Sequence, residues 1–518
     1  MNTFKKLILV LLALPVLLTG CDQKFDDINK NPNQTISVPS PFIMSYAQRE
    51  LGYYLYDVWR SGRQSTVAAQ HWGQINYTDE DRYLFRQEVT DGFFRQTYII
   101  LQSFQDIINL NTNEATKGSM LAFGDNEMQI ATATLMKIWA IELLAETFGD
   151  VPYTDALQPA TIVQPSYDTQ ATLLPKLLTD ATAAVNALKQ SDLGWTQGDV
   201  IFGGDLDKWI KFGNSLKLRL VVRMSNVRNT WQTEAQAIIA DGVMEDLSDN
   251  ARIKFVGAGA PNEAPLYNGF VVSARNDFSM TKQFANLLKG FNDTDKGYTN
   301  PFFGLEDPRF IVYIGAANYN AGKKNGIPYG MTDAQTGAYV NANSATFINL
   351  KSNPLPLVIT ADYWSTFLDY PTVCFLKSEA YGWNAQYFED GIRASLEQWG
   401  ADVDEEYIAD VMTIFNGANT EKKKEIVMTQ KYIHLYTQSF EAWAEYRRTG
   451  YPGSLVKPGQ ITNGTIVFTP SNETGGIVVP RLKYDTNEYT LNKENVEAAA
   501  TSIGGDAYTT KLWWAKQN

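Results

Sequence analysis

The chain has 518 residues, a formal net charge of −13 and a pI near 4.9. This length is sufficient for two or three domains, or for one large helical array, and for a sizeable hydrophobic core. The acidic balance disfavours nucleic acid and anionic lipid surfaces as partners, because both would repel the average protein surface.

Residues 1–20 have the features of a lipoprotein signal peptide. Lys5 and Lys6 precede an apolar run over residues 7–18, which is too short to remain as a membrane-spanning helix. The run ends in Leu-Thr-Gly-Cys, and a cysteine directly after Leu-x-Gly is typical of a bacterial lipoprotein. We therefore expect cleavage before Cys21, lipid on its thiol, and a polar tether over residues 21–40. An ordinary signal peptide with an incidental cysteine is the alternative.

Helical spacing dominates residues 41–250, which we interpret as the N-terminal part of a helical scaffold. Apolar residues recur at three- and four-residue intervals over 43–58, 94–108 and 128–143. Asp125 is expected to cap the third of these helices, and Gly149 and Pro152 to end it. Asp168 is expected to cap the next one. A later helix carries basic residues that we expect to pair with acidic neighbours: Lys208, Lys211, Lys217, Arg219 and Arg223.

Aromatic and amide side chains gather between the first two helices, on a segment without a clear period. Trp72, Asn76 and Tyr77 are the ligand candidates there. Flat rings next to amides suit a sugar, because the C–H groups of a sugar lie on a ring face while amides bond its hydroxyls. The alternative is a loop whose aromatic rings fill the core.

Residues 251–369 differ in composition from the helical segment before them, because they are rich in Gly, Asn, Pro and Tyr. One short helix is predicted there, in SMTKQFANLLKG. The stretch is too long for a plain connection and too aromatic for disorder, so it predicts an ordered, loop-rich ligand-binding insertion. Its candidates for ligand contact are Tyr267, Asn268, Arg275, Asn276, Tyr319, Asn320 and Tyr329.

Asp293, Asp295 and Gly297 within this insertion resemble the start of a calcium loop. No glutamate follows at the distance where such a loop places its bidentate ligand. We therefore expect no cofactor, and calcium stays as the alternative.

Residues 370–518 return to helical patterns, as the C-terminal part of the scaffold followed by an extended segment. Cys374 is expected to be a small buried side chain, because lipid on Cys21 would leave it without a disulfide partner. One long helix is predicted over residues 425–449. His434 lies on its polar face and is expected to be solvated or interfacial.

The sequence contains few candidates for catalytic residues. His71 and His434 are the chain's two histidines, neither belongs to a metal-binding HExxH motif, and no P-loop or dinucleotide fingerprint occurs. A glycosidase needs only a pair of carboxylates, and with 57 acidic residues the sequence leaves that enzyme class open.

The ordered set of motifs resembles the SusD/RagB family of nutrient-binding outer-membrane lipoproteins, in its SusD-like branch. The matching pieces span almost the whole chain: LTGC, Asn-Pro-Asn at 31–33, FGDVPYTDAL, PSYDTQ, GDLDKWIKFGNSLKLRL, Glu379 in FLKSEAYGW, EAWAEYRRTGYP and VPRLKYDTNEYTLN. The resemblance implies an all-α fold, in which a tetratricopeptide-like helical scaffold carries an irregular loop-rich ligand-binding subdomain. The chain itself shows no regular 34-residue repeat.

The resemblance also implies a function without catalysis. Such a protein would be lipid-anchored to the outer membrane, facing the cell exterior, and would pass an oligosaccharide or another small nutrient to a SusC-like TonB-dependent barrel. Binding residues differ between family members, so the resemblance assigns none here. A lipid-anchored glycosidase and a helical adaptor that binds only protein remain the alternatives.

Overall fold

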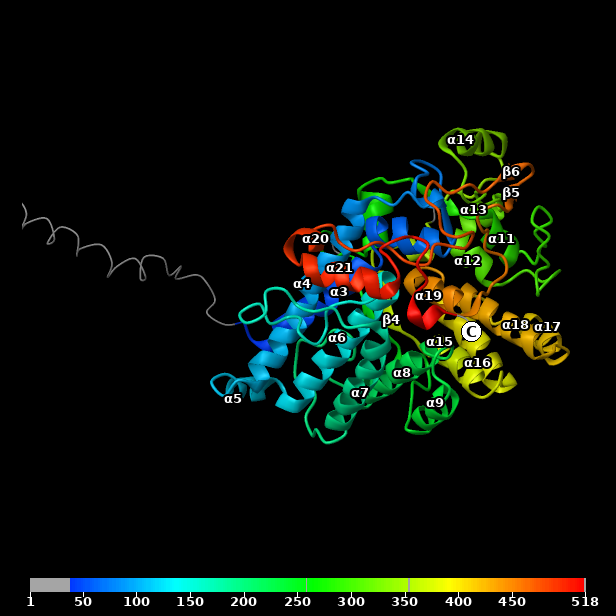
Figure 1. Ribbon diagram of the computed structural model, residues 1–518. Helices are drawn as coiled ribbons and strands as arrows, with labels where there is room; N and C mark the ends of the chain where they lie inside the picture. Colours follow the sequence, from blue (N-terminus) through cyan, green and yellow to red (C-terminus); the bar gives the residue numbers. More distant parts are fainter. Residues whose placement is uncertain (1–37, 258, 353–354, 517–518) are drawn as a thin grey trace, which may run out of the picture.

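The computed structural model describes residues 38–257, 259–352 and 355–516 and is mainly helical, which confirms the predicted fold class (Figure 1). The predicted signal peptide, Cys21 and residues 21–37 of the tether lie outside the described residues. The scaffold begins with α3 (Ser40–Leu55), α4 (Gln87–Thr112), α5 (Lys117–Met120), α6 (Asn126–Phe148), α7 (Gln170–Leu188), α8 (Leu206–Arg223) and α9 (Trp231–Ala240). Apart from the short α5, each of these helices packs on the next one, so they form a continuous array.

Helix α6 is the centre of this array. Its predicted apolar stripe is buried, and α4 and α7 cover it. In the described part of the chain it is the one helix long and apolar enough to cross a membrane, but 83% of its apolar window is buried inside the protein. The Asp125 carboxylate makes no capping bond to α6, contrary to the prediction, and accepts instead from the backbone N–H groups of Asp192 and Leu193.

The FGDVPY turn joins α6 to α7. Val151 pairs with Asp168 in an antiparallel bridge, and the Asp168 carboxylate accepts from the N–H groups of Tyr153 and Thr154 at 2.9 and 2.8 Å. Because that carboxylate is occupied, it does not cap α7 as predicted. Asp150 accepts from the N–H of Gln170 at the start of α7 instead.

Four of the five basic residues of α8 pair with carboxylates, as predicted, whereas no described carboxylate pairs with Lys208. Lys211 lies 3.0 Å from Asp249, and Arg219 lies 2.5 Å from Glu142 of α6. These pairs hold α8 to its neighbours on both sides.

The predicted insertion leaves the scaffold and returns at one place. Strand β2 (Ala251–Lys254) at its beginning pairs antiparallel with β4 (Trp364–Leu368) at its end. A second antiparallel pair joins β1 (Trp72–Gln74) to β3 (Phe278–Met280). The helices between are short: α10 (Pro265–Tyr267), α11 (Lys282–Leu288), α12 (Arg309–Ile314), α13 (Ala316–Asn320) and α14 (Asp333–Ala342).

The C-terminal scaffold helices are α15 (Tyr370–Ala380), α16 (Ala385–Trp399), α17 (Glu405–Asn416), α18 (Thr420–His434) and α19 (Ser439–Thr449). Cys374 is buried, as predicted. The single long helix predicted over 425–449 is wrong, because the chain breaks between α18 and α19. His434 is also not solvated: it is fully buried, with Nε2 3.0 Å from Asp369 and Nδ1 2.9 Å from Ser395.

The final segment covers the end of α6. It contains β5 (Ile461–Asn463), β6 (Ile466–Val467), α20 (Glu488–Leu491) and α21 (Lys493–Ile503). The N–H of Leu482 donates to the carbonyl of Thr147, and the Arg481 guanidinium donates to that of Phe148. The C-terminal segment is therefore part of the packed structure.

Candidate ligand-binding site

Two chain segments from distant parts of the sequence meet at one end of the β1–β3 pair. The pairing continues past Gln74, because the N–H of Ile75 donates to the carbonyl of Asp277 at 2.7 Å. The Asn76 side-chain amide then donates to the carbonyl of Asn276 at 2.8 Å. Residues 75–77 and 275–277 are thus neighbours at the protein surface.

Two π-helical turns lie next to these segments. The first, η2 (Val58–Thr66), begins where the Asp57 carboxylate accepts from the N–H groups of Trp59 and Arg60. The second is η6 (Asn268–Val272), and its Gly269 packs against Val58. π-Helical turns are rare and occur frequently at functional sites.

Trp59 connects the two sides of this surface. The guanidinium carbon of Arg275 lies over its ring, 4.5 Å from the ring centre, and that of the buried Arg63 lies at 4.8 Å. Arg63 also bridges two buried carboxylates, Glu80 at 3.2 Å and Asp277 at 2.7 Å. The half-buried indole therefore packs against a guanidinium that a buried ion-pair network holds in place.

Tyr77 and Ala274 are non-glycine residues in the left-handed backbone region, with φ of 56° and 51°. Tyr77 is 56% exposed, and the Arg86 guanidinium carbon lies 5.9 Å from its ring centre. Such strained residues cluster at ligand sites, where the surrounding structure holds them. We call this region the Trp59 surface: Trp59, Asn76, Tyr77, Asn268, Arg275 and Asn276.

The structure brings together five of the predicted ligand residues and separates the others. Asn76, Tyr77, Asn268, Arg275 and Asn276 lie on the Trp59 surface, and the half-buried Tyr267 directly precedes η6. Asn320 is exposed, and Tyr319 is half-buried on α13, where Lys324 lies over its ring.

Trp72 and Tyr329 are not available as stacking platforms, which corrects their prediction. Trp72 is 1% exposed and its indole N–H donates to the Tyr436 hydroxyl at 2.7 Å. Tyr329 is fully buried against Phe468. Both rings fill the core, which for Trp72 is the alternative left open for its segment.

Trp59, the central residue of this surface, is not among the residues predicted from the sequence. It lies directly after Val58, where the helical spacing of α3 ends, and it is unremarkable by pattern alone. The signal that could have found it is the run of Trp and Arg residues at 59–63, because rings and guanidinium groups stack on one another.

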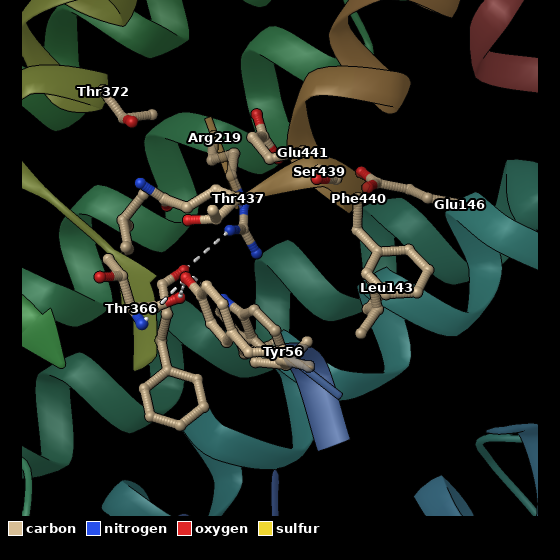
Figure 2. A pocket seen from close by; sticks show the side chains of 15 residues that line it. Tyr56, Leu143, Glu146, Arg219, Thr366, Thr372, Thr437, Ser439, Phe440 and Glu441 are labelled. Atoms are coloured by element: carbon tan, nitrogen blue, oxygen red, sulfur yellow. Dashed lines mark hydrogen bonds between the residues drawn. The ribbon is translucent and has the colours of Figure 1, made fainter. Parts of the chain in front are cut away.

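An internal cavity lies elsewhere, between α6, α8 and the break before α19 (Figure 2). Arg219 reaches into it among Tyr56, Thr366 and Thr437, and Glu146 and Glu441 lie at its edge (Figure 2). Its volume is about 40 Å³, enough for a few water molecules. Ligand pockets measure roughly 300–1,000 Å³, so a sugar ring does not fit here.

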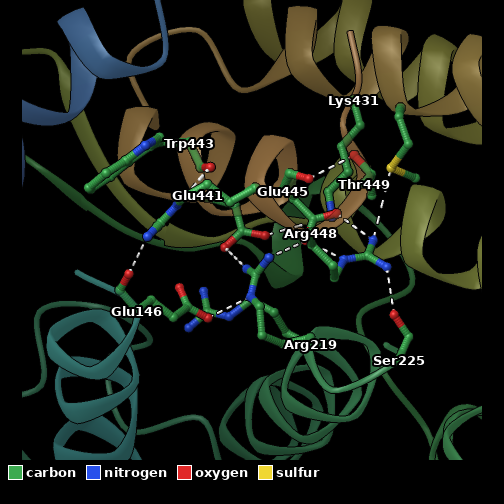
Figure 3. A network of polar contacts seen from close by, with 12 residues as sticks. Glu146, Arg219, Ser225, Lys431, Glu441, Trp443, Glu445, Arg448 and Thr449 are labelled. Carbon is green, nitrogen blue, oxygen red and sulfur yellow. Dashed lines mark hydrogen bonds and ion pairs between the residues drawn. The ribbon is translucent and has the colours of Figure 1, made fainter. Parts of the chain in front are cut away.

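The carboxylates near this cavity belong to a buried ion-pair network (Figure 3). Burial raises the pKa of Glu146 to about 8 against the opposing charge of Arg223, which is a property that a glycosidase acid needs. The Glu146 carboxylate is nevertheless ion-paired, because Arg223 lies 2.5 Å from it. Arg223 also pairs with Glu441 at 2.6 Å and with Glu445. Because the adjoining cavity is too small for a sugar ring, we interpret the network around Glu146 as structural.

Two other candidate sites, a hydrolase triad and a calcium loop, consist of side chains that already bind other protein groups. Ser395, His434 and Asp369 have the residue types of a hydrolase triad, but all three are fully buried and Arg309 donates to the Ser395 hydroxyl. In the segment that resembles the start of a calcium loop, Lys282 lies 2.6 Å from the Asp295 carboxylate. Within the described residues, no group of three or more His, Cys, Asp or Glu side chains could hold a metal ion.

Comparison with known proteins gives the family. Residues 32–469 match the SusD-like family model that is described as starch-binding and associating with the outer membrane. The chain belongs to this SusD-like family. No curated protein sequence matches the chain.

Solved structures of SusD-like proteins share the fold over nearly the full length. A SusD homolog from Bacteroides vulgatus is 22% identical with a TM-score of 0.73, and the match covers 92% of this chain and 98% of that one. A chitin-binding SusD homolog from Flavobacterium johnsoniae is 20% identical with a TM-score of 0.72 and the same coverage of both chains. The predicted family is therefore confirmed.

Proposed function

We propose that this SusD-like protein binds an oligosaccharide on the Trp59 surface without cleaving it. The observation that carries the proposal is the convergence of Trp59, Tyr77 and three side-chain amides on one strained, solvent-facing surface. Aromatic faces and amides are the groups that hold the two sides of a sugar ring. The starch-binding description of the family and the chitin-binding homolog support a glycan as ligand.

The proposal includes delivery to a transporter. The lipid on Cys21 anchors the protein at the outer membrane, on the exterior face, and a SusC-like TonB-dependent barrel receives the ligand. The family description, which links starch binding with the outer membrane, and the Leu-Thr-Gly-Cys motif support this part. A ligand that must be released again suits micromolar to millimolar affinity, roughly −8 to −4 kcal/mol.

The test is calorimetric titration of the protein from residue 38 onward with starch, chitin, pectin and alginate oligosaccharides, followed by an assay for new reducing ends. Saturable heat without new reducing ends is the expected result. New reducing ends would instead favour the glycosidase, and saturation by none of these glycans would overturn glycan binding. Incorporation of labelled palmitate, lost in Cys21→Ala, checks the anchor.

A further inference from the structure

The charges on the Trp59 surface differ in sign from those of the protein as a whole. The chain carries a net charge of −13, yet two cationic side chains, Arg275 and Lys351, lie beside Trp59 and residues 274–276. We infer that the ligand is an anionic oligosaccharide, whose carboxylate or sulfate groups pair with Arg275. This inference rests on the proposed function, because it names the class of glycan that the same surface binds.

Arg275 is positioned to bind an anion. Its guanidinium carbon lies over the Trp59 ring, 4.5 Å from the ring centre, so the indole restrains the position of the group. Its nearest carboxylate is Asp277 at 3.8 Å, beyond hydrogen-bond distance, and Arg63 already binds that carboxylate at 2.7 Å. No described residue accepts a hydrogen bond from this guanidinium, so its paired donors are open to a carboxylate or sulfate.

A second cation lies beside Arg275. The Lys351 ammonium donates to the carbonyl of Ala274 at 3.3 Å, which places it next to the backbone that carries Arg275. No described carboxylate pairs with Lys351. Two cations at neighbouring positions would attract an anionic chain toward the surface before it makes contact.

The nearby carboxylates do not cancel these two charges. Glu80 and Asp277 are buried and are shared by Arg63, and Arg86 also pairs with Glu80 at 3.1 Å. Glu263 is buried behind the Asn268 amide, and Asp333 accepts from the backbone N–H of Thr78. Asp333 and Asp79 are the carboxylates that face outward near Tyr77, and Arg82 pairs with Asp79 at 2.9 Å.

The experiment compares acidic and neutral glycans on the same protein. Affinity electrophoresis and calorimetry are carried out with polygalacturonate, alginate and chondroitin sulfate, and with starch, chitin oligosaccharides and carboxyl-reduced polygalacturonate. We expect at least one acidic glycan to bind and the neutral ones to bind at least about 10-fold more weakly. Raising the salt concentration should weaken the acidic ligand selectively, because exposed charges are screened.

Arg275→Gln is the decisive variant. It removes the charge, keeps an amide, and should weaken the acidic glycan by about 10-fold or more, since charge-assisted bidentate bonds are the strong ones. Arg228→Gln is the matched control, because the Arg228 side chain is similarly exposed, 32% against 36%, and lies in the α8–α9 connection. It should leave affinity unchanged.

Two results would contradict the inference in different ways. Binding of neutral glycans alone, lost in Tyr77→Ala and unaffected in Arg275→Gln, would overturn the anionic ligand and leave the proposed function standing. Binding of neither glycan class would overturn the proposed function itself, and this inference with it.

Discussion

At the scale of single residues, neighbouring positions have opposite roles. Trp72 lies within β1 and is buried, whereas Tyr77, beyond the end of that strand, is exposed. Both were predicted as ligand residues, because the sequence shows the type of a residue but not its burial. Trp59 was not predicted as a ligand residue, because it directly follows the helical spacing of residues 43–58.

Removal of a platform ring is the most direct test at this scale. Tyr77→Ala should weaken glycan binding by about 1–3 kcal/mol, because stacking area is lost, and Trp59→Ala should weaken it because Arg275 loses the ring that positions its guanidinium. Tyr77→Ala should leave the free energy of unfolding within about 0.5 kcal/mol of its original value, since Tyr77 is exposed. Calorimetry and urea denaturation measure the two quantities. Tyr381→Ala, at an exposed tyrosine directly after α15, is the control, and equal losses in both tyrosine variants would refute the assignment.

His71 predicts a dependence of stability on pH. It is fully buried among Phe284, Tyr432 and Tyr436, and burial lowers its pKa to about 3, with the hydrogen bond to the Tyr432 carbonyl opposing. The unfolded chain takes up a proton near pH 6.5 and the folded chain does not, so acidification favours unfolding between pH 6.5 and 3.

The expected loss from this one group approaches about 1.4 kcal/mol per pH unit below pH 6. Denaturant unfolding at pH 7.5, 6 and 5 measures it, with His71→Gln as comparison, because glutamine can still donate to the Tyr432 carbonyl. The difference in unfolding free energy between the two proteins should shrink as the pH falls. A difference that stays constant over this range would show that His71 is not held neutral.

At the scale of elements, the sequence predicted where helices exist better than how they end. The stripes of α3, α4, α6 and α8 follow from apolar spacing, a local property. The break between α18 and α19 does not follow from apolar spacing, because it involves the distant residue Asp369. That carboxylate binds His434 of α18 and the Gln438 amide just before α19, and it comes from the distant start of α15.

The contact between the two π-helical turns can be tested by adding one carbon. A Cβ on Gly269 would lie 2.4 Å from a methyl carbon of Val58, so Gly269→Ala should destabilise the protein by about 1–3 kcal/mol. The double variant with Val58→Ala removes the clash and should cost less than the two single variants added together. Urea denaturation of all four proteins gives the coupling, and simple additivity would contradict this packing.

The ion-pair network that joins α8 to α6 and α19 should be costly to break. Arg223→Ala leaves Glu146, Glu441 and Glu445 with one buried cation fewer, so we expect a loss of about 3–5 kcal/mol in unfolding free energy. Lys208→Ala, on the first turn of the same helix, should change it by less than about 0.5 kcal/mol. Similar effects of both substitutions would mean that the network does not stabilise the fold.

At the scale of the whole molecule, the order of motifs predicted the family and the helical fold, because these motifs lie along nearly the entire chain. The candidate site could be predicted only in part. It forms where residues 59, 76–77 and 268–276 meet, and one sequence does not reveal that the β1–β3 pair joins positions about 200 residues apart. The pairing of β2 with β4, which closes the insertion on the scaffold, is equally non-local.

The central claim is that an intact glycan binds on the Trp59 surface. A crystal structure of the protein with the tightest-binding oligosaccharide from the titration panel tests it most directly. We expect uncleaved sugar density in contact with Trp59 and Tyr77, with a sugar anion beside the Arg275 guanidinium. Density at another place, such as the exposed Phe291 and Phe303 of the insertion, or a cleaved product, would contradict it.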